Sequence, residues 1–116
     1  MPAISVVMPV YNTKDYVAKA IQSILDQTFS DFEFLIIDNG STDGSGTIIN
    51  QFAQKDARIR VIRNEKNVFI AEARNRALAQ AKGEYLYLID SDDWVLPDML
   101  EVMYGRAKRF DAQYVV

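Results

Sequence analysis

Short apolar runs alternate with stretches of helical periodicity along the whole of this 116-residue chain. The apolar runs predict strands over residues 4–10, 32–37, 58–63 and 84–89. The stretches between and after them place apolar residues one helical turn apart, which predicts helices over 13–27, 47–55, 70–81 and 97–109. Strands and helices that alternate with short connections favour right-handed crossovers and a mainly parallel sheet. The sequence therefore predicts an α/β fold.

Several local features refine this prediction. Residues 4–10 and 85–89 are nearly continuous in apolar side chains, which predicts strands that are buried. Asn12 or Thr13 can cap the first helix, and Gly83 is expected to terminate the third. Residues 114–116 resemble the opening of a fifth strand.

In a parallel sheet, ligands bind outside the carboxyl ends of the strands. Three polar, turn-rich segments follow strands here, at 9–13, 38–46 and 90–93, so we expect them at one edge. The first contains no glycine after the strand, which excludes the dinucleotide fingerprint and the P-loop. Tyr11 in that segment can stack on a nucleobase or pack at the sheet edge. In the second segment Asp38 can accept hydrogen bonds from a ligand, whereas Asp43 or Ser45 is expected to cap the next helix.

The third segment carries three carboxylates within four residues, Asp90, Asp92 and Asp93. Two like charges about 4 Å apart repel by roughly 1 kcal/mol in water and by more near a protein surface. Solvent, a shared proton or a divalent cation would each relieve this repulsion. Oxygen-only ligands suit Mg²⁺ or Mn²⁺, which commonly take a substrate phosphate as a further ligand. The segment is either a cation and phosphate site or a solvated loop with helix-capping acids.

Composition narrows the possible chemistry. The chain contains no histidine and no cysteine, which excludes Ser–His catalysis, histidine-ligated zinc and disulfide scaffolds. A net charge of −3 predicts no nucleic-acid binding. No apolar run approaches the roughly 18 residues that span a bilayer, and no signal peptide is evident. We therefore expect a cytoplasmic chain without a transmembrane segment.

Four motifs occur in the order and register of family 2 glycosyltransferases. They are Ser5-Val6-Val7-Met8-Pro9-Val10-Tyr11-Asn12, Ile37-Asp38-Asn39-Gly40-Ser41-Thr42-Asp43-Gly44-Ser45, Ala73-Arg74-Asn75, and Lys82-Gly83-Glu84-Tyr85 leading into Leu88-Ile89-Asp90-Ser91-Asp92-Asp93. From residue 4 to about residue 100 the chain resembles the amino-terminal half of such an enzyme with the GT-A fold. The resemblance implies a Rossmann-like, three-layer α/β/α arrangement that is truncated after the half containing the DxD motif. Residues 1–116 would then form a single partial domain that binds a nucleotide sugar, with the acceptor half missing.

The resemblance also implies an activity. A sugar would pass from a nucleotide-diphosphate sugar, usually a UDP-sugar, to a hydroxyl of a glycan or lipid-linked acceptor, with inversion and with the help of Mn²⁺ or Mg²⁺. Such enzymes build polysaccharides and cell-envelope glycans in the cytoplasm or at the inner face of the membrane. The residues that the resemblance assigns to the donor nucleotide are Pro9, Val10, Tyr11, Asn12, Asp38, Arg74, Asp90 and Ser91. It assigns the metal ion to Asp92, the likeliest direct ligand, and to Asp90.

Two departures from the family pattern limit the expected activity. Phe69 stands where the family usually has a glycine that permits positive φ and close backbone approach. The general base, a carboxylate in this family, would lie beyond Val116, so these residues alone should not transfer sugar efficiently. We also expect exposed apolar sheet surface to favour self-association.

The same residues leave one alternative to a transferase open and disfavour another. A non-catalytic nucleotide-binding module would need only the donor residues. A sugar-phosphate nucleotidyltransferase normally has a glycine-rich, basic loop after the first strand, and residues 9–13 lack one.

Overall fold

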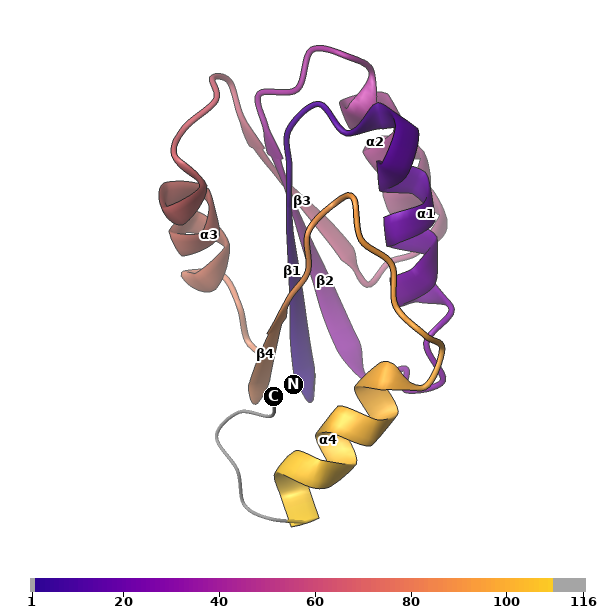
Figure 1. Ribbon diagram of the computed structural model, residues 1–116. Helices are drawn as coiled ribbons and strands as arrows, with labels where there is room; N and C mark the ends of the chain where they lie inside the picture. Colours follow the sequence, from indigo (N-terminus) through magenta and orange to yellow (C-terminus); the bar gives the residue numbers. More distant parts are fainter. Residues whose placement is uncertain (1, 110–116) are drawn as a thin grey trace.

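The computed structural model describes residues 2–109 and places a four-stranded sheet between layers of helices (Figure 1). The elements in chain order are β1 (Ile4–Val10), α1 (Lys14–Leu25), β2 (Phe32–Asn39), α2 (Ser45–Lys55), β3 (Ile59–Asn64), α3 (Ile70–Leu78), β4 (Tyr85–Leu88) and α4 (Met99–Arg109). The strands lie in the order β3-β2-β1-β4, and every pair is parallel. The α/β fold with a parallel sheet, inferred from the alternating pattern, is confirmed.

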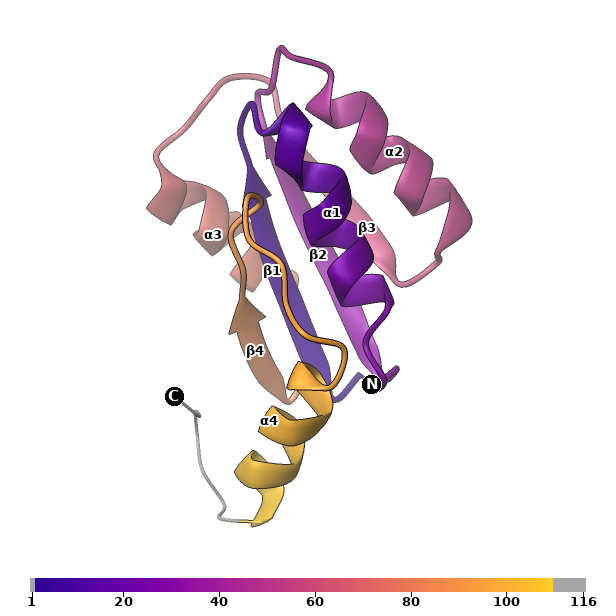
Figure 2. The same cartoon turned by 45° about the vertical axis from the view of Figure 1, so that its right-hand side comes forward.

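Helices cover both faces of the central strands. α1 and α2 lie on one face and α3 on the other, as the turned view shows (Figure 2). Alternate residues of β1 face opposite ways: Val6 and Met8 pack with α1, whereas Val7 packs with Ala73 and Ala77 of α3. Because both faces are covered, β1 reads as a continuous apolar run.

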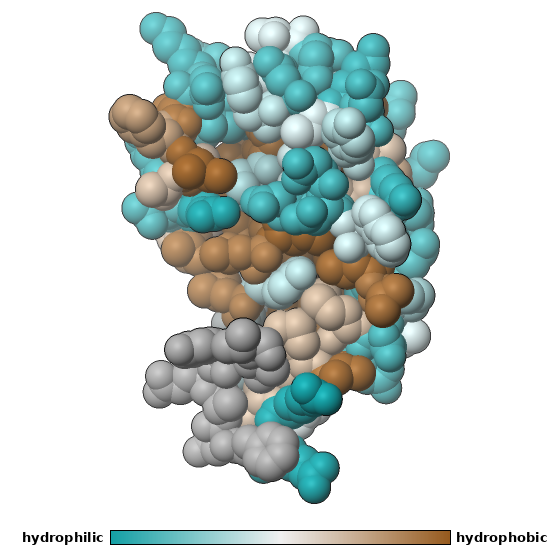
Figure 3. All heavy atoms as spheres, viewed as in Figure 1, coloured by the Kyte–Doolittle hydropathy of each residue, from teal (hydrophilic) through white to brown (hydrophobic). Residues whose placement is uncertain are grey.

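β4 differs from the buried strand that its sequence predicts. Among residues 2–109 it lies at an edge of the sheet and pairs with β1 alone, and Leu86 and Leu88 are 52% and 44% exposed. Their register with Ser5 and Val7 places them on the face that α3 covers over β1 and β2. Within residues 2–109, α3 does not extend over β4. The strand therefore has the predicted apolar side chains, but the face that carries Leu86 and Leu88 is not covered. Hydrophobic side chains accordingly form a band across the middle of the molecule (Figure 3).

The segment after β4 returns across the end of α1, and Gln27 holds its far end where α4 begins. Buried Gln27 donates to the carbonyl of Leu96 at 2.7 Å and accepts the amide of Leu100 at 2.9 Å. Leu100 is buried in the same core as α1. Helix α4 begins at Met99, two residues after the predicted start, and it lies near the amino ends of β1 and β4 (Figure 1).

The connection from α3 to β4 also differs from prediction. α3 ends at Leu78 rather than at residue 81, and Gly83 does not terminate it. Instead Gly83 packs directly on β1 and donates its amide to the Ser5 hydroxyl at 2.8 Å. The Ser5 hydroxyl donates in turn to Glu33, which also accepts the Lys82 amide. This connection therefore ends in contacts with the sheet rather than in a helix cap.

The expected strand over residues 114–116 lies outside the described residues. Within residues 2–109 no helix is both long enough and apolar enough to cross a membrane.

We expect Gly83→Ala to destabilise the fold by about 2 kcal/mol, because the new methyl group overpacks a fixed backbone contact. A Cβ at this position would lie 2.5 Å from the Ser5 nitrogen. Gly105 offers a matched control, since a Cβ there meets nothing within 4 Å. Gly105→Ala should stabilise helix α4 by about 1 kcal/mol. Urea denaturation measures both changes, and equal midpoints for the two variants would contradict the prediction.

Glu33 should make stability pH-dependent. Burial raises the pKa of Glu33, but hydrogen bonds from Ser5 and the Lys82 amide and the charge of Arg60 outweigh this and hold it below the ordinary 4.5. The unfolded chain therefore takes up the proton first, and the contribution of Glu33 is lost as the pH falls below about 5. Denaturation at several pH values should show the stability gap between the native chain and Glu33→Gln shrinking toward low pH. A gap that is constant with pH would refute this assignment.

Candidate functional site

The carboxyl edge of the sheet holds a cavity of about 500 Å³. It is lined by the end of β1, by the loop that leads into α3, and by the turn that follows β4. The lining residues are Pro9, Val10, Tyr11, Thr13, Asn39, Asn67, Val68, Phe69, Ile70, Asp90, Ser91 and Asp92. The expectation that the segments after the first and last strands share one edge is thus confirmed.

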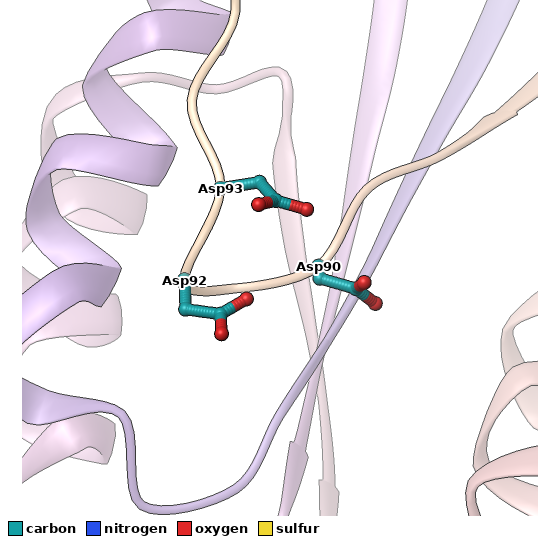
Figure 4. Close-up of side chains that lie close together, drawn as sticks. All are labelled: Asp90, Asp92 and Asp93. Carbon is teal, nitrogen blue, oxygen red and sulfur yellow. The ribbon is translucent and has the colours of Figure 1, made fainter.

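The acidic turn after β4 gathers three carboxylates. The amide of Asp93 donates to the carbonyl of Asp90 at 3.1 Å, which closes the turn. Carboxylate oxygens of Asp90, Asp92 and Asp93 then lie within 4.8 Å of one another, and all three residues are exposed. The three side chains extend to one side of the turn (Figure 4). This all-oxygen donor set fits a hard divalent cation, with water or phosphate completing the coordination.

Neighbouring side chains fix the acidic turn. Ser91 is buried, and its hydroxyl accepts a hydrogen bond of 2.7 Å from the Thr13 hydroxyl at the start of α1. Further along, Gln27 holds the Leu96 carbonyl. Lys19 of α1 lies over the ring of Trp94 at 4.5 Å from its centroid. The acidic turn and the residues that follow it therefore contact α1 and the residues at both of its ends. These contacts fix the position of the turn relative to β1.

The negative charges of the acidic turn affect two neighbouring side chains, Tyr87 and Arg74. Burial raises the pKa of Tyr87, and the negative charges of Asp93 and Asp90 raise it further. Arg74 of α3 places Nη2 at 3.7 Å from Asp90, a partly exposed ion pair. Its Nε is the one buried side-chain polar atom without a hydrogen-bond partner among residues 2–109. Arg74 therefore lies beside the acidic turn and has an Nε–H group that donates to no other residue in the described part of the chain.

Tyr11 lines the cavity and is 46% exposed. The next residue, Asn12, contacts a neighbouring loop instead. Asn12 is absent from the lining and adopts a left-handed φ of 52°. Its side-chain oxygen accepts the Thr42 amide at 2.8 Å, and its own amide donates to Ser41 at 3.1 Å. The structure thus gives Asn12 a role in joining the first two loops, and its predicted contact with the nucleotide stays a prediction.

Helix capping differs from the prediction as well. Neither Asn12 nor Thr13 caps α1 with its side chain. Asp43 instead accepts the Lys14 amide at 3.0 Å and the Ser45 amide at 3.0 Å, at the starts of α1 and α2. Hydrogen bonding by the Ser45 hydroxyl is the main cause of a lowered pKa at Asp43. One carboxylate therefore serves the first turns of two helices.

Asp38 lies away from the cavity that Tyr11 lines. It is 3% exposed and borders a neighbouring cavity of about 420 Å³ with Arg63, whose Nε lies 3.5 Å away. It also accepts the Ser41 amide at 3.0 Å. Successive strand residues point to opposite faces, so Asn39 rather than Asp38 faces the Tyr11 cavity.

Asn39 is a site residue that sequence reasoning missed. Its amide nitrogen donates to Asn67 at 2.7 Å and to the Val68 carbonyl at 2.8 Å. Its oxygen accepts the Val68 amide at 3.1 Å and the Asn64 side chain at 3.0 Å. Both donors and both acceptor sites of this buried amide are thus used. The signal available in the sequence is the recurrence of asparagine, at positions 39 and 64 where β2 and β3 end and at position 67 in the loop after β3.

Comparisons with known proteins agree with this geometry. The family model described as glycosyl transferase family 2 matches residues 5–116. Glycosyltransferase GlyG of Streptococcus pneumoniae is 42% identical over 113 residues, covering 97% of this chain and 38% of GlyG. Among solved structures, S. aureus TarS 1-349 in complex with UDP-GlcNAc has a TM-score of 0.83 at 32% identity, covering 96% of this chain and 31% of that one.

A second solved structure contains a metal ion. Mannosyltransferase PcManGT from Pyrobaculum calidifontis, in complex with GDP-Man and Mn²⁺, has a TM-score of 0.75 at 25% identity. The match covers 80% of this chain and 28% of that chain. This chain spans between 10% and 40% of the length of eight curated relatives that it matches.

We expect Asn39→Asp to destabilise the chain by about 1–3 kcal/mol, because a carboxylate oxygen would face the Asn67 oxygen and the Val68 carbonyl without a proton to donate. Asn50 provides a matched control: it is exposed and uses only its oxygen, toward Arg63 at 3.3 Å. Asn50→Asp should be nearly neutral. Urea denaturation compares the two variants, and hydrogen exchange at the Val68 amide should accelerate only in Asn39→Asp. Equal stabilities would show that the network contributes nothing.

Proposed function

The chain belongs to glycosyl transferase family 2, and on that basis we propose that it binds the nucleotide-diphosphate sugar donor of a sugar-transfer reaction. The observation that carries this proposal is the shared cavity. Tyr11 from the first strand end and the acids from the last strand end line the same space, although they lie far apart in the sequence. A flat aromatic ring beside a carboxylate cluster matches a ligand with a base at one end and phosphates at the other.

The metal site in this proposal consists of Asp92 and Asp90, with Asp93 next to them. A divalent cation, Mn²⁺ or Mg²⁺, would offset the charge of the two phosphates and of the departing nucleoside diphosphate. The PcManGT structure, which contains Mn²⁺ with its nucleotide sugar, supports this choice of cofactor. The acids of this chain are already gathered within 4.8 Å, so metal binding requires little movement of the backbone.

The remaining donor contacts divide by position. Pro9, Val10 and Tyr11 are proposed to line the base and ribose, with Ser91 beside them. Arg74 would turn its unpartnered Nε to the diphosphate. Asn12 and Asp38 are also proposed as donor contacts, from the loops that border the cavity, where one oxygen of each side chain accepts a backbone amide.

The donor is proposed to be a UDP-sugar, and the TarS complex with UDP-GlcNAc supports that class. An enzyme with this donor site would act, with inversion, on a hydroxyl of a glycan or lipid-linked acceptor in polysaccharide or cell-envelope synthesis. We assign residues 1–116 to the donor-binding half of one GT-A domain. The acceptor site and the general base would come from elsewhere in the full-length protein, so this chain alone should show no efficient transfer.

Metal-dependent binding of UDP tests the proposal. Calorimetry should show UDP binding in the presence of Mn²⁺ and a loss of about tenfold or more in Asp92→Asn, since a direct ligand is removed. Asp31 lies at the opposite edge of the sheet, just before β2, so Asp31→Asn is a charge-matched control that should bind normally. Binding that is indifferent to Mn²⁺ or to Asp92→Asn would reject the metal site. Release of UDP from a UDP-sugar by the full-length protein would separate an enzyme from a non-catalytic nucleotide-binding module.

A further inference from the structure

Phe69 is the most exposed large hydrophobic residue in the part of the chain that the structure describes, at 87%. It lies directly before α3 and lines the same cavity as Tyr11 and the acidic turn. Ile70, its neighbour, is also exposed and lines the cavity. In the space-filling view, hydrophobic side chains project over the start of α3, above the hydrophobic band (Figure 3). An aromatic ring of this size gains free energy from any ligand that covers it.

The backbone that carries Phe69 is fixed on both sides. Val68 is held through its amide and its carbonyl by Asn39, at 3.1 Å and 2.8 Å. The carbonyl of Phe69 accepts the Ala73 amide at 3.0 Å, the first hydrogen bond of α3. Phe69 has a φ of −57°, which any residue can adopt, so the chain needs no glycine here. These hydrogen bonds therefore fix the backbone position from which the Phe69 ring extends at the rim of the cavity.

Charge and polarity divide the cavity into two ends. The acids follow β4, whereas Phe69 comes from the loop after β3, and β1 with Tyr11 lies between them in the sheet order. Phosphates and their cation belong at the acidic end. At the other end, both donors and both acceptor sites of the Asn39 amide already form hydrogen bonds within the protein. The other lining residues there, Val68, Phe69 and Ile70, have apolar side chains. A sugar placed there would leave hydroxyl groups unsatisfied, whereas the face of a nucleobase would not.

We propose that Phe69 forms an aromatic wall for the nucleobase of the donor, opposite the phosphate end of the cavity, and so sets the affinity for the base. This rests on the proposed function, because it takes the ligand to be a nucleoside diphosphate. Stacking of a base on an aromatic side chain is tolerant of sequence and strong enough to change affinity about tenfold or more. Phe69 thereby adds affinity for the base without a hydrogen bond and without selecting among bases.

Three ligands measured by calorimetry with Mn²⁺ test the inference: UDP, inorganic pyrophosphate and UDP-GlcNAc. Phe69→Ala should weaken UDP and UDP-GlcNAc by the same factor, about tenfold, and leave pyrophosphate within about twofold. Phe69→Trp should restore UDP binding. Leu86→Ala, which shortens an exposed apolar side chain on β4, is the matched control and should change none of the three.

The outcomes separate the inference from the proposed function. If the native chain binds neither UDP nor pyrophosphate with Mn²⁺, the proposed donor site itself fails. If it binds both and Phe69→Ala binds UDP as tightly as the native chain, the aromatic wall is wrong while the donor site stands. A loss confined to UDP-GlcNAc would place the ring on the sugar and overturn the assignment to the base. Because Phe69 is exposed, thermal denaturation should show the variant folded.

Discussion

The geometry of the site depends on how the chain satisfies backbone amides where the parallel strands end. Beyond the last ladder hydrogen bond, an amide in a loop must find another acceptor or remain unpaired. Here side-chain oxygens at one strand end accept backbone amides from another. The Asn12 side chain accepts the Thr42 amide, and the Ser41 side chain accepts the Asn12 amide. In the same way, Asp43 accepts the Lys14 amide and Asn39 accepts the Val68 amide. The loops are consequently joined pairwise across the sheet edge, and these hydrogen bonds hold the walls of the cavity.

The same bonds determine where an anion can be received. The first amide of α1, at Lys14, is already donated to Asp43, so this helix end does not offer that amide to a phosphate. With no glycine after β1, the backbone there cannot form a phosphate-binding loop either. In the proposed donor site, positive charge for a diphosphate would come from Arg74 and from a cation on the acidic turn. Such a cation would also offset the three acids at the end of β4 in a chain whose net charge is already negative.

Features set by short-range pattern were predictable from the sequence, and features set by distant partners were not. The parallel sheet, its functional edge and the clustering of the acids follow from periodicity and from four consecutive residues. Asn12 and Asp38 show the limit, because a polar residue after a strand can bind a ligand or a backbone amide equally well. The burial of Leu86 and Leu88 likewise depends on what lies over β4, which their own alternation does not encode. Asn39 could be found only by relating it to Asn64, its partner in the register of β2 and β3, and to Asn67 in the loop after β3.

The attachment of the acidic turn to α1 has an entropic consequence. Because the Thr13–Ser91 and Gln27–Leu96 hydrogen bonds hold the chain on either side of the acids, backbone order is already established in the folded protein. An ion bound there, as proposed, would have to immobilise only the short carboxylate side chains, and each of these has few rotatable bonds. Conformational freedom would then be given up during folding rather than during ion binding, so more of the intrinsic attraction between ion and oxygen would remain as affinity.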